Sequence, residues 1–107
     1  MDEVKPMPDD YKVVWDVLVE HRSISLDKLT GLTGFNQRKV RQIIKELIEN
    51  FDCLIGSNSN PGGYFIIETQ DQFDWAMAEL SSRIYELTVR KNHLAKAWSL
   101  RKTEKLF

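Results

Sequence analysis

Cationic side chains gather over eight residues within the stretch TGFNQRKVRQIIKELIEN, residues 33–50: Arg38, Lys39, Arg41 and Lys45. Arginine can make bidentate contacts with guanine and with phosphate, lysine binds phosphate, and a glutamine such as Gln42 matches the edge of adenine. Glutamates follow only at positions 46 and 49, so all four cations precede the acidic residues of the stretch. These residue types suit contact with a polyanion, above all double-stranded DNA.

A helix that begins after Asn36 and runs through Asn50 would present these side chains together. The residues Val40, Ile43, Ile44, Leu47 and Ile48 recur at helical spacing and form one apolar stripe. At about 100° per residue, Arg38, Gln42 and Lys45 project away from that stripe. Because recognition helices approach base edges with their N-terminal residues, the predicted DNA contacts on this helix are Asn36, Gln37, Arg38, Lys39, Arg41, Gln42 and Lys45.

The spacing of the cations also has an energetic meaning. Arg38 and Arg41, and Arg41 and Lys45, are like-charged neighbours at i+3 and i+4, which costs a few tenths of a kcal/mol in a bare helix. A phosphate backbone would relieve that repulsion, and nearby glutamates would relieve it too. The alternative interpretation is an ordinary core helix whose solvated face is basic.

Other chemistry finds little support in the sequence. The single cysteine, Cys53, and two histidines 72 positions apart, His21 and His93, give no zinc pattern. The loop GSNSNPGG lacks the lysine of a phosphate-binding loop. Helix capping explains the paired carboxylates better than acid–base catalysis does. We therefore expect no enzyme activity, no cofactor and no metal; the carboxylates in question are Asp9, Asp10, Asp71 and Asp74.

The composition describes a globular chain of 107 residues, with 42% hydrophobic and 29% charged residues. The net charge is −1, but residues 36–50 carry +2, residues 51–82 carry −5 and residues 83–107 carry +5. No apolar run reaches the ~18 residues of a membrane helix, and no secretory signal is visible. A lone cysteine fits a reducing compartment, so we expect a cytoplasmic protein of a bacterium or of a phage-infected cell.

The elements that must position the basic helix are readable from apolar spacing and turn residues. A helix is predicted from Asp9 or Asp10 to His21, and a shorter one over residues 26–32 with Ser25 as its N-cap. Gly34 would end that short helix in the left-handed conformation, and Phe35 would pack inward. The runs CLIGSN and YFIIET, separated by the turn-forming SNPGG, predict a β-hairpin.

The order helix, helix, tight turn, helix, hairpin resembles the winged helix-turn-helix family. LDKLTGLTGFNQRKVRQIIKEL resembles its helix-turn-helix and CLIGSNSNPGGYFII its wing, and the whole is similar to small winged-helix proteins of phages and prophages. The resemblance covers roughly residues 9–70 and implies a mainly α (α+β) fold that binds DNA, as a regulator or as a replication or packaging accessory. The resemblance also implies that Ser57, Asn58 and Asn60 of the wing contact DNA. The wing has no cation, however, and these residues also suit a plain turn.

A final helix, capped by Thr69 or Asp71, is predicted to continue to about Lys102. Its apolar residues are spaced by alternating steps of four and three, as in a coiled coil, with Lys91 the single polar member. We expect a homodimer or larger homo-oligomer through this seam; the alternative is a helix that breaks and folds back. The seam residues are Phe73, Met77, Leu80, Ile84, Leu87, Leu94 and Trp98.

These predictions divide the chain into a flexible lead-in (1–8), a winged-helix domain (9–70), the long helix (71–102) and a tail (103–107). A competing function of a different class also fits the charges. In it the chain is a protein–protein adaptor that binds no DNA, and the acidic segment 51–82 or the basic segment 83–107 docks a charged partner.

Overall fold

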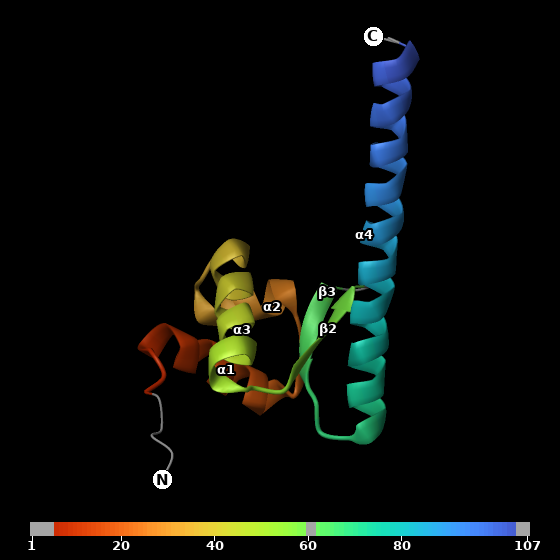
Figure 1. The fold of residues 1–107 in the computed structure, drawn as a ribbon. Helices are drawn as coiled ribbons and strands as arrows, with labels where there is room; N and C mark the ends of the chain where they lie inside the picture. The colour runs from red at the N-terminus through yellow and green to blue at the C-terminus, as the bar shows by residue number, and fades with distance from the viewer. Residues whose placement is uncertain (1–5, 60–61, 105–107) are drawn as a thin grey trace. The chain divides into compact units, whose positions relative to one another are not determined.

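The computed structural model describes residues 6–59 and 62–104, with the side chains of 102–104 left out. This part of the chain forms four helices and a small antiparallel sheet, so the fold is mainly α with an α+β character (Figure 1). The contacts divide the chain into two compact units, residues 1–73 and 74–107. The elements in order are α1 (Asp9–His21), β1 (Ser23–Ser25), α2 (Leu26–Thr33), α3 (Gln37–Phe51), β2 (Ile55–Ser59), β3 (Gly62–Ile66) and α4 (Gln70–Glu104).

The helix boundaries before α3 follow the predicted caps. The Ser25 hydroxyl accepts a hydrogen bond from the Lys28 amide at 3.2 Å, and so opens α2. Gly34, at a φ of 77°, ends α2 and donates its amide to the Thr30 carbonyl. Asn36 Oδ1 then accepts from the Lys39 amide at 2.8 Å and opens α3. The predicted helix, turn and helix over residues 26–50 are confirmed, with α3 one residue longer than expected.

The sheet contains a strand that was not predicted. Its order is β1-β3-β2, all antiparallel, with Ile24 opposite Tyr64 and Ser57 also opposite Tyr64 on the other side. Strand β1 lies so close to β3 that a Cβ on Gly63 would meet the Ile24 carbonyl oxygen at 2.5 Å. Gly63 is therefore a close-packing position inside the sheet and not a residue of the turn.

The second strand begins later than the sequence indicates. Cys53 was expected to open it, but the Cys53 amide donates to the Leu47 carbonyl at 3.0 Å and completes the end of α3. Asp52, just before it, takes a left-handed φ of 55°. The chain therefore needs two further residues to leave the helix, and the ladder starts at Ile55.

The core of the first unit lies between its three helices and its sheet. One residue of the predicted apolar stripe is wrong: Ile48 is 42% exposed, because it lies beside the buried stripe of α3 and not within it. Leu32 on α2 is likewise 53% exposed. Phe35 does pack against the core, but only partly buried. The buried cluster is Val14, Leu18, Ile24, Leu29, Val40, Ile43, Ile44, Leu47, Ile55 and Ile66.

Helix α4 is continuous from Gln70 to Glu104, so the predicted alternative of a break does not occur within it. Its start is a reciprocal cap: the Thr69 hydroxyl accepts from the Gln72 amide at 3.1 Å, and Gln72 Oε1 accepts from the Thr69 amide at 3.0 Å. Thr69 is thus the cap, and Asp71 lies in the first turn. Among the described helices, α4 included, none has the length and apolarity needed to cross a membrane.

Candidate nucleic-acid interface

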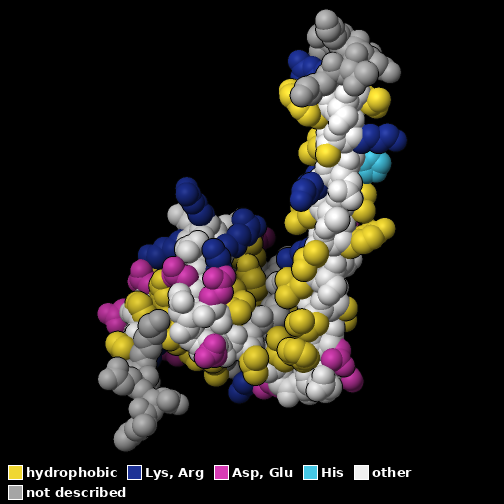
Figure 2. Space-filling model, in the orientation of Figure 1, with side chains coloured by type: hydrophobic (Ala, Val, Ile, Leu, Met, Phe, Trp, Pro, Cys, Tyr) yellow, Lys and Arg dark blue, Asp and Glu magenta, His cyan; other side chains and the backbone are white. Residues whose placement is uncertain are grey.

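Helix α3 separates its apolar and basic residues onto opposite faces. Val40, Ile43, Ile44 and Leu47 are buried in the core, whereas Arg38, Lys39, Arg41, Gln42 and Lys45 are all exposed. Lys and Arg side chains gather over the end of this unit at which α3 begins, and acidic side chains lie next to them (Figure 2). The structure therefore brings the predicted helical contacts together on one solvent-facing surface.

Three of the cations on this surface have no ion pair or hydrogen bond with the rest of the described chain. They are Arg38, Arg41 and Lys45, and nothing in residues 6–59 or 62–101 neutralises them. An exposed cation without an ion pair has no internal carboxylate to release before it binds a phosphate. These three side chains give the face its positive charge.

Lys39 is different, because the protein already uses its ammonium group. Its Nζ lies 2.7 Å from Asp10 Oδ2 on α1 and 4.1 Å from the centre of the Phe35 ring. Both carboxylate and ammonium are about half exposed, so the pair contributes modestly to stability. Lys39 joins α1 to the start of α3 and offers less free charge than sequence alone suggested.

Two amide side chains of the face are held by neighbouring carboxylates. Gln42 Nε2 donates to Glu46 Oε1 at 3.2 Å, one turn further along α3. Gln37 Nε2 donates to Asp27 Oδ1 on α2 at 3.3 Å. Both bonds are exposed, so each amide can be released toward a ligand at small cost.

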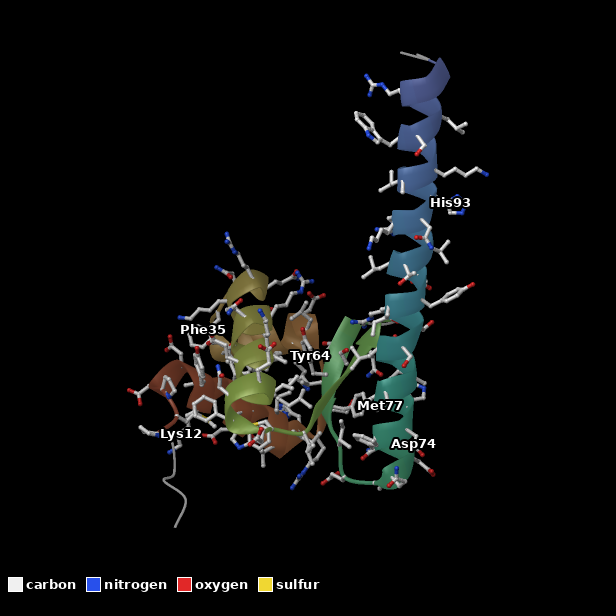
Figure 3. The ribbon with its side chains drawn as sticks, viewed as in Figure 1. Lys12, Phe35, Tyr64, Asp74, Met77 and His93 are labelled. Carbon is white, nitrogen blue, oxygen red and sulfur yellow. The ribbon has the colours of Figure 1, made fainter. Side chains whose placement is uncertain are left out.

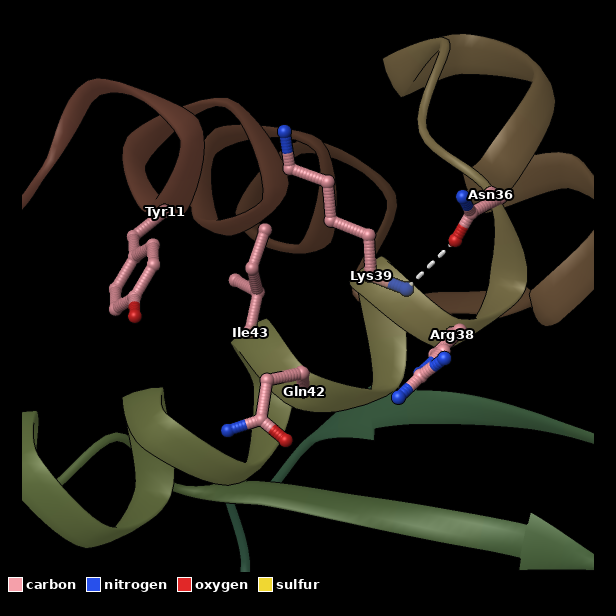
Figure 4. Close-up of a pocket in the computed structure, with 6 residues that line it drawn as sticks. All are labelled: Tyr11, Asn36, Arg38, Lys39, Gln42 and Ile43. Carbon is pink, nitrogen blue, oxygen red and sulfur yellow. Dashed lines mark hydrogen bonds between the residues drawn. The ribbon is translucent and has the colours of Figure 1, made fainter.

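An open hollow of about 530 Å³ lies beside these residues, at the start of α3 (Figure 4). Tyr11 stands at helical spacing with the apolar residues of α1, and the sequence gives no sign of a role for it outside the core. Its half-buried ring packs edge-on against Phe51 and still borders the hollow. The hollow has room for a phosphate group or a base edge, and its walls supply cations, amides and one aromatic ring: Tyr11, Asn36, Arg38, Lys39, Gln42 and Ile43.

Two of the hairpin residues predicted to contact DNA lie in the sheet. Ser57 and Asn58 lie within β2, opposite Tyr64 and Gly63, in the run CLIGSN that was predicted as a strand; the alternative of a plain turn does not apply to them. Both side chains are only partly exposed, and Ser57 has an interaction of its own. Asn60 lies outside the described residues. The hairpin also has no Lys or Arg, so the cationic groups of the candidate interface lie on α3.

In the part of the chain that the structure describes, neither the cysteine nor the acidic and histidine side chains form a second site. Burial raises the pKa of the Cys53 thiol, and the charge of Asp52 raises that pKa further, so little nucleophilic thiolate is present near neutral pH. Within the described residues no three His, Cys, Asp or Glu side chains are grouped as metal ligands would be.

Comparisons with protein-family models, with curated proteins and with solved structures give no match for this chain.

Proposed function

We propose that this chain binds double-stranded DNA, with α3 as the recognition helix of a winged helix-turn-helix and β2–β3 as its wing. The element order supports this proposal, since α2 and α3 are joined by residues 34–36 alone and a hairpin follows. The observation that carries it is the set of three exposed, unpaired cations on α3, opposite a fully packed apolar face.

The roles of the side chains follow from their places on α3. Arg38, Gln42 and Lys45 point away from the core and would face the major groove, where arginine and glutamine recognise guanine and adenine edges. Arg41, which flanks them, would bind a phosphate. Lys39 and Gln37 already bond to acidic side chains and would make weaker backbone contacts.

The test is a salt-titrated binding assay on mixed duplexes, followed by selection of a preferred site from a random pool. DNA binding predicts an affinity that falls steeply with salt, because each phosphate contact releases counterions. Arg41→Ala should weaken all sequences similarly and reduce the salt slope by about 1. Arg38→Ala should cost about 1–3 kcal/mol on the preferred site and much less elsewhere.

Two matched variants make the assay specific. Arg38→Lys keeps the charge but removes the bidentate fork, so it should retain general binding and lose site preference. Lys12→Ala removes an exposed cation of α1, which lies away from Phe35 and the start of α3 in Figure 3, and should leave binding unchanged. Loss of affinity in the Lys12 variant equal to that of Arg41→Ala would contradict the proposed surface.

One observation favours a second candidate, the protein–protein adaptor. Residues 51–82, which include the hairpin, carry five acidic side chains and no cation, which repels a phosphate backbone. Absence of detectable DNA binding at about 50 mM salt would favour this candidate over DNA recognition.

A further inference from the structure

Helix α4 carries an apolar seam that solvent reaches along most of its length. Met77, Leu80, Ile84, Leu87, Leu94 and Trp98 are each between 48% and 65% exposed. They recur in alternating steps of three and four once Lys91 is included, so they lie along one narrow line of the helix. A line of large apolar side chains on a helix of 35 residues is the surface that helix pairing buries.

The area available on this seam is large enough for a specific interface. Side chains of this size expose roughly 200 Å² each when free, so six at about half exposure present about 600 Å². Two such helices would bury about 1,200 Å², which reaches the lower bound for stable protein–protein interfaces. A second copy of α4 is the one partner that the chain itself always supplies.

The charges along α4 select the orientation of that second copy. Its first part, residues 70–82, carries three acidic residues and no cation, whereas residues 83–104 carry six cations and two acids. A parallel pair would lay the two basic parts side by side. An antiparallel pair lays the basic part of each helix along the acidic part of the other, which is attractive at both ends.

We propose that α4 pairs antiparallel with α4 of a second copy of this chain, with Ile84 of each copy against Leu87 of the other. This register continues outward without a gap, pairing Leu80 with Lys91, Met77 with Leu94 and Phe73 with Trp98. The pairing is independent of DNA binding, because it uses only α4.

The first experiment compares two adjacent substitutions of similar exposure. Ile84→Glu places a charge in the seam, and Tyr85→Glu places the same charge one residue away, outside the seam; these positions are 65% and 71% exposed. We expect the full chain to be a dimer by sedimentation equilibrium at about 100 μM. Ile84→Glu should raise the dissociation constant by about tenfold or more, and Tyr85→Glu by less than about threefold. Circular dichroism checks that both variants keep their helix.

A monomeric wild-type chain at that concentration overturns the proposal, and so does equal weakening by the two glutamates. The second experiment reads the orientation, in a Cys53→Ser background. Chains with Met77→Cys and chains with Leu94→Cys should form a disulfide with each other after mixing and oxidation, and few with themselves. Efficient cross-linking of each variant to its own kind would show a parallel pair and overturn the antiparallel register.

Discussion

Helices α3 and α4 both carry an apolar stripe at helical spacing, yet the stripe of α3 is buried and the stripe of α4 is largely exposed. In α3 the stripe is buried against α1, α2 and the sheet, and Leu47 has no exposed surface. In α4 the stripe remains about half exposed, and Leu87 is 58% exposed. The difference teaches that periodicity predicts a face that favours burial but does not predict what covers it. Substitutions can measure how far the two stripes differ in energy.

The largest expected effect is Leu47→Ala, compared with Leu87→Ala. Leu47 is fully buried, so its truncation should lower the free energy of unfolding by about 2–5 kcal/mol, from lost burial and the cavity left behind. Leu87→Ala should change the stability of the first unit by less than about 0.5 kcal/mol. Chemical denaturation followed by tryptophan fluorescence, at a protein concentration where α4 is unpaired, checks both. Equal losses would mean that the stripe of α4 is not exposed.

A similar comparison applies to aromatic residues, with Phe35→Ala and Trp98→Ala. Truncation of a fully buried phenylalanine to alanine lowers the free energy of unfolding by about 3–5 kcal/mol. Phe35 is only partly buried, and its ring also contacts the Lys39 ammonium. We therefore expect Phe35→Ala to lower the free energy of unfolding by about 2–3 kcal/mol. Trp98→Ala should leave the melting of the first unit unchanged. A Phe35 variant that melts like the wild type would show that the turn before α3 does not contribute to the core.

The next prediction sharpens the comparison within the first unit, between Gly63 and Gly62. An added methyl on Gly63 would meet the backbone of Ile24 and Ser25, which cannot move aside easily. Gly63→Ala should thus lower the free energy of unfolding of the first unit by about 1–3 kcal/mol. Gly62 has no atom within 4 Å of such a methyl, so Gly62→Ala is the control and should be nearly neutral. Thermal melts of the two variants give the answer, and a neutral Gly63→Ala would show that β1 is not tightly paired.

The smallest expected effect concerns the Asp10–Lys39 pair. Because both side chains are about half exposed, solvent screens their attraction, and a double-mutant cycle should give a coupling of at most about 1 kcal/mol. The coupling should shrink as salt is added. A value that stays constant up to ~1 M salt would show that a screened attraction between charges is not what couples Asp10 to Lys39.

Local chemistry explains why much of the fold could be predicted. Ser25, Gly34 and Asn36 act on backbone groups within three or four residues of themselves, so their sequence positions fixed both ends of the turn before α3. The exposed face of α3 was equally readable, since 3.6-residue periodicity places Arg38 and Lys45 opposite the buried stripe. These parts of the candidate site needed no knowledge of distant residues.

The parts that could not be predicted depend on residues far away in the chain. Ser23–Ser25 is only three residues long, too short for its alternation to predict a strand, and it becomes a strand because β3 lies beside it. The late start of β2 depends on the Cys53 amide, which the end of α3 uses. Likewise, the partial neutralisation of Lys39 comes from Asp10, 29 positions earlier. Spacing within one element contains no information about any of these contacts.

The pairing of β1 with β3 has a consequence for how the chain is synthesised. Ser23 pairs with Phe65, which is synthesised 42 residues later. Because a ribosome adds ~5–20 residues per second, the edge of β1 that pairs with β3 stays unpaired for about 2–8 s. Once Phe51 has been added, the nascent chain contains all of α1, α2 and α3, while Ile24 still lacks its partner strand on one side. A ribosome that stalls before Ile66 would release three helices beside an unpaired strand edge, a product suited to chaperone capture or to aggregation.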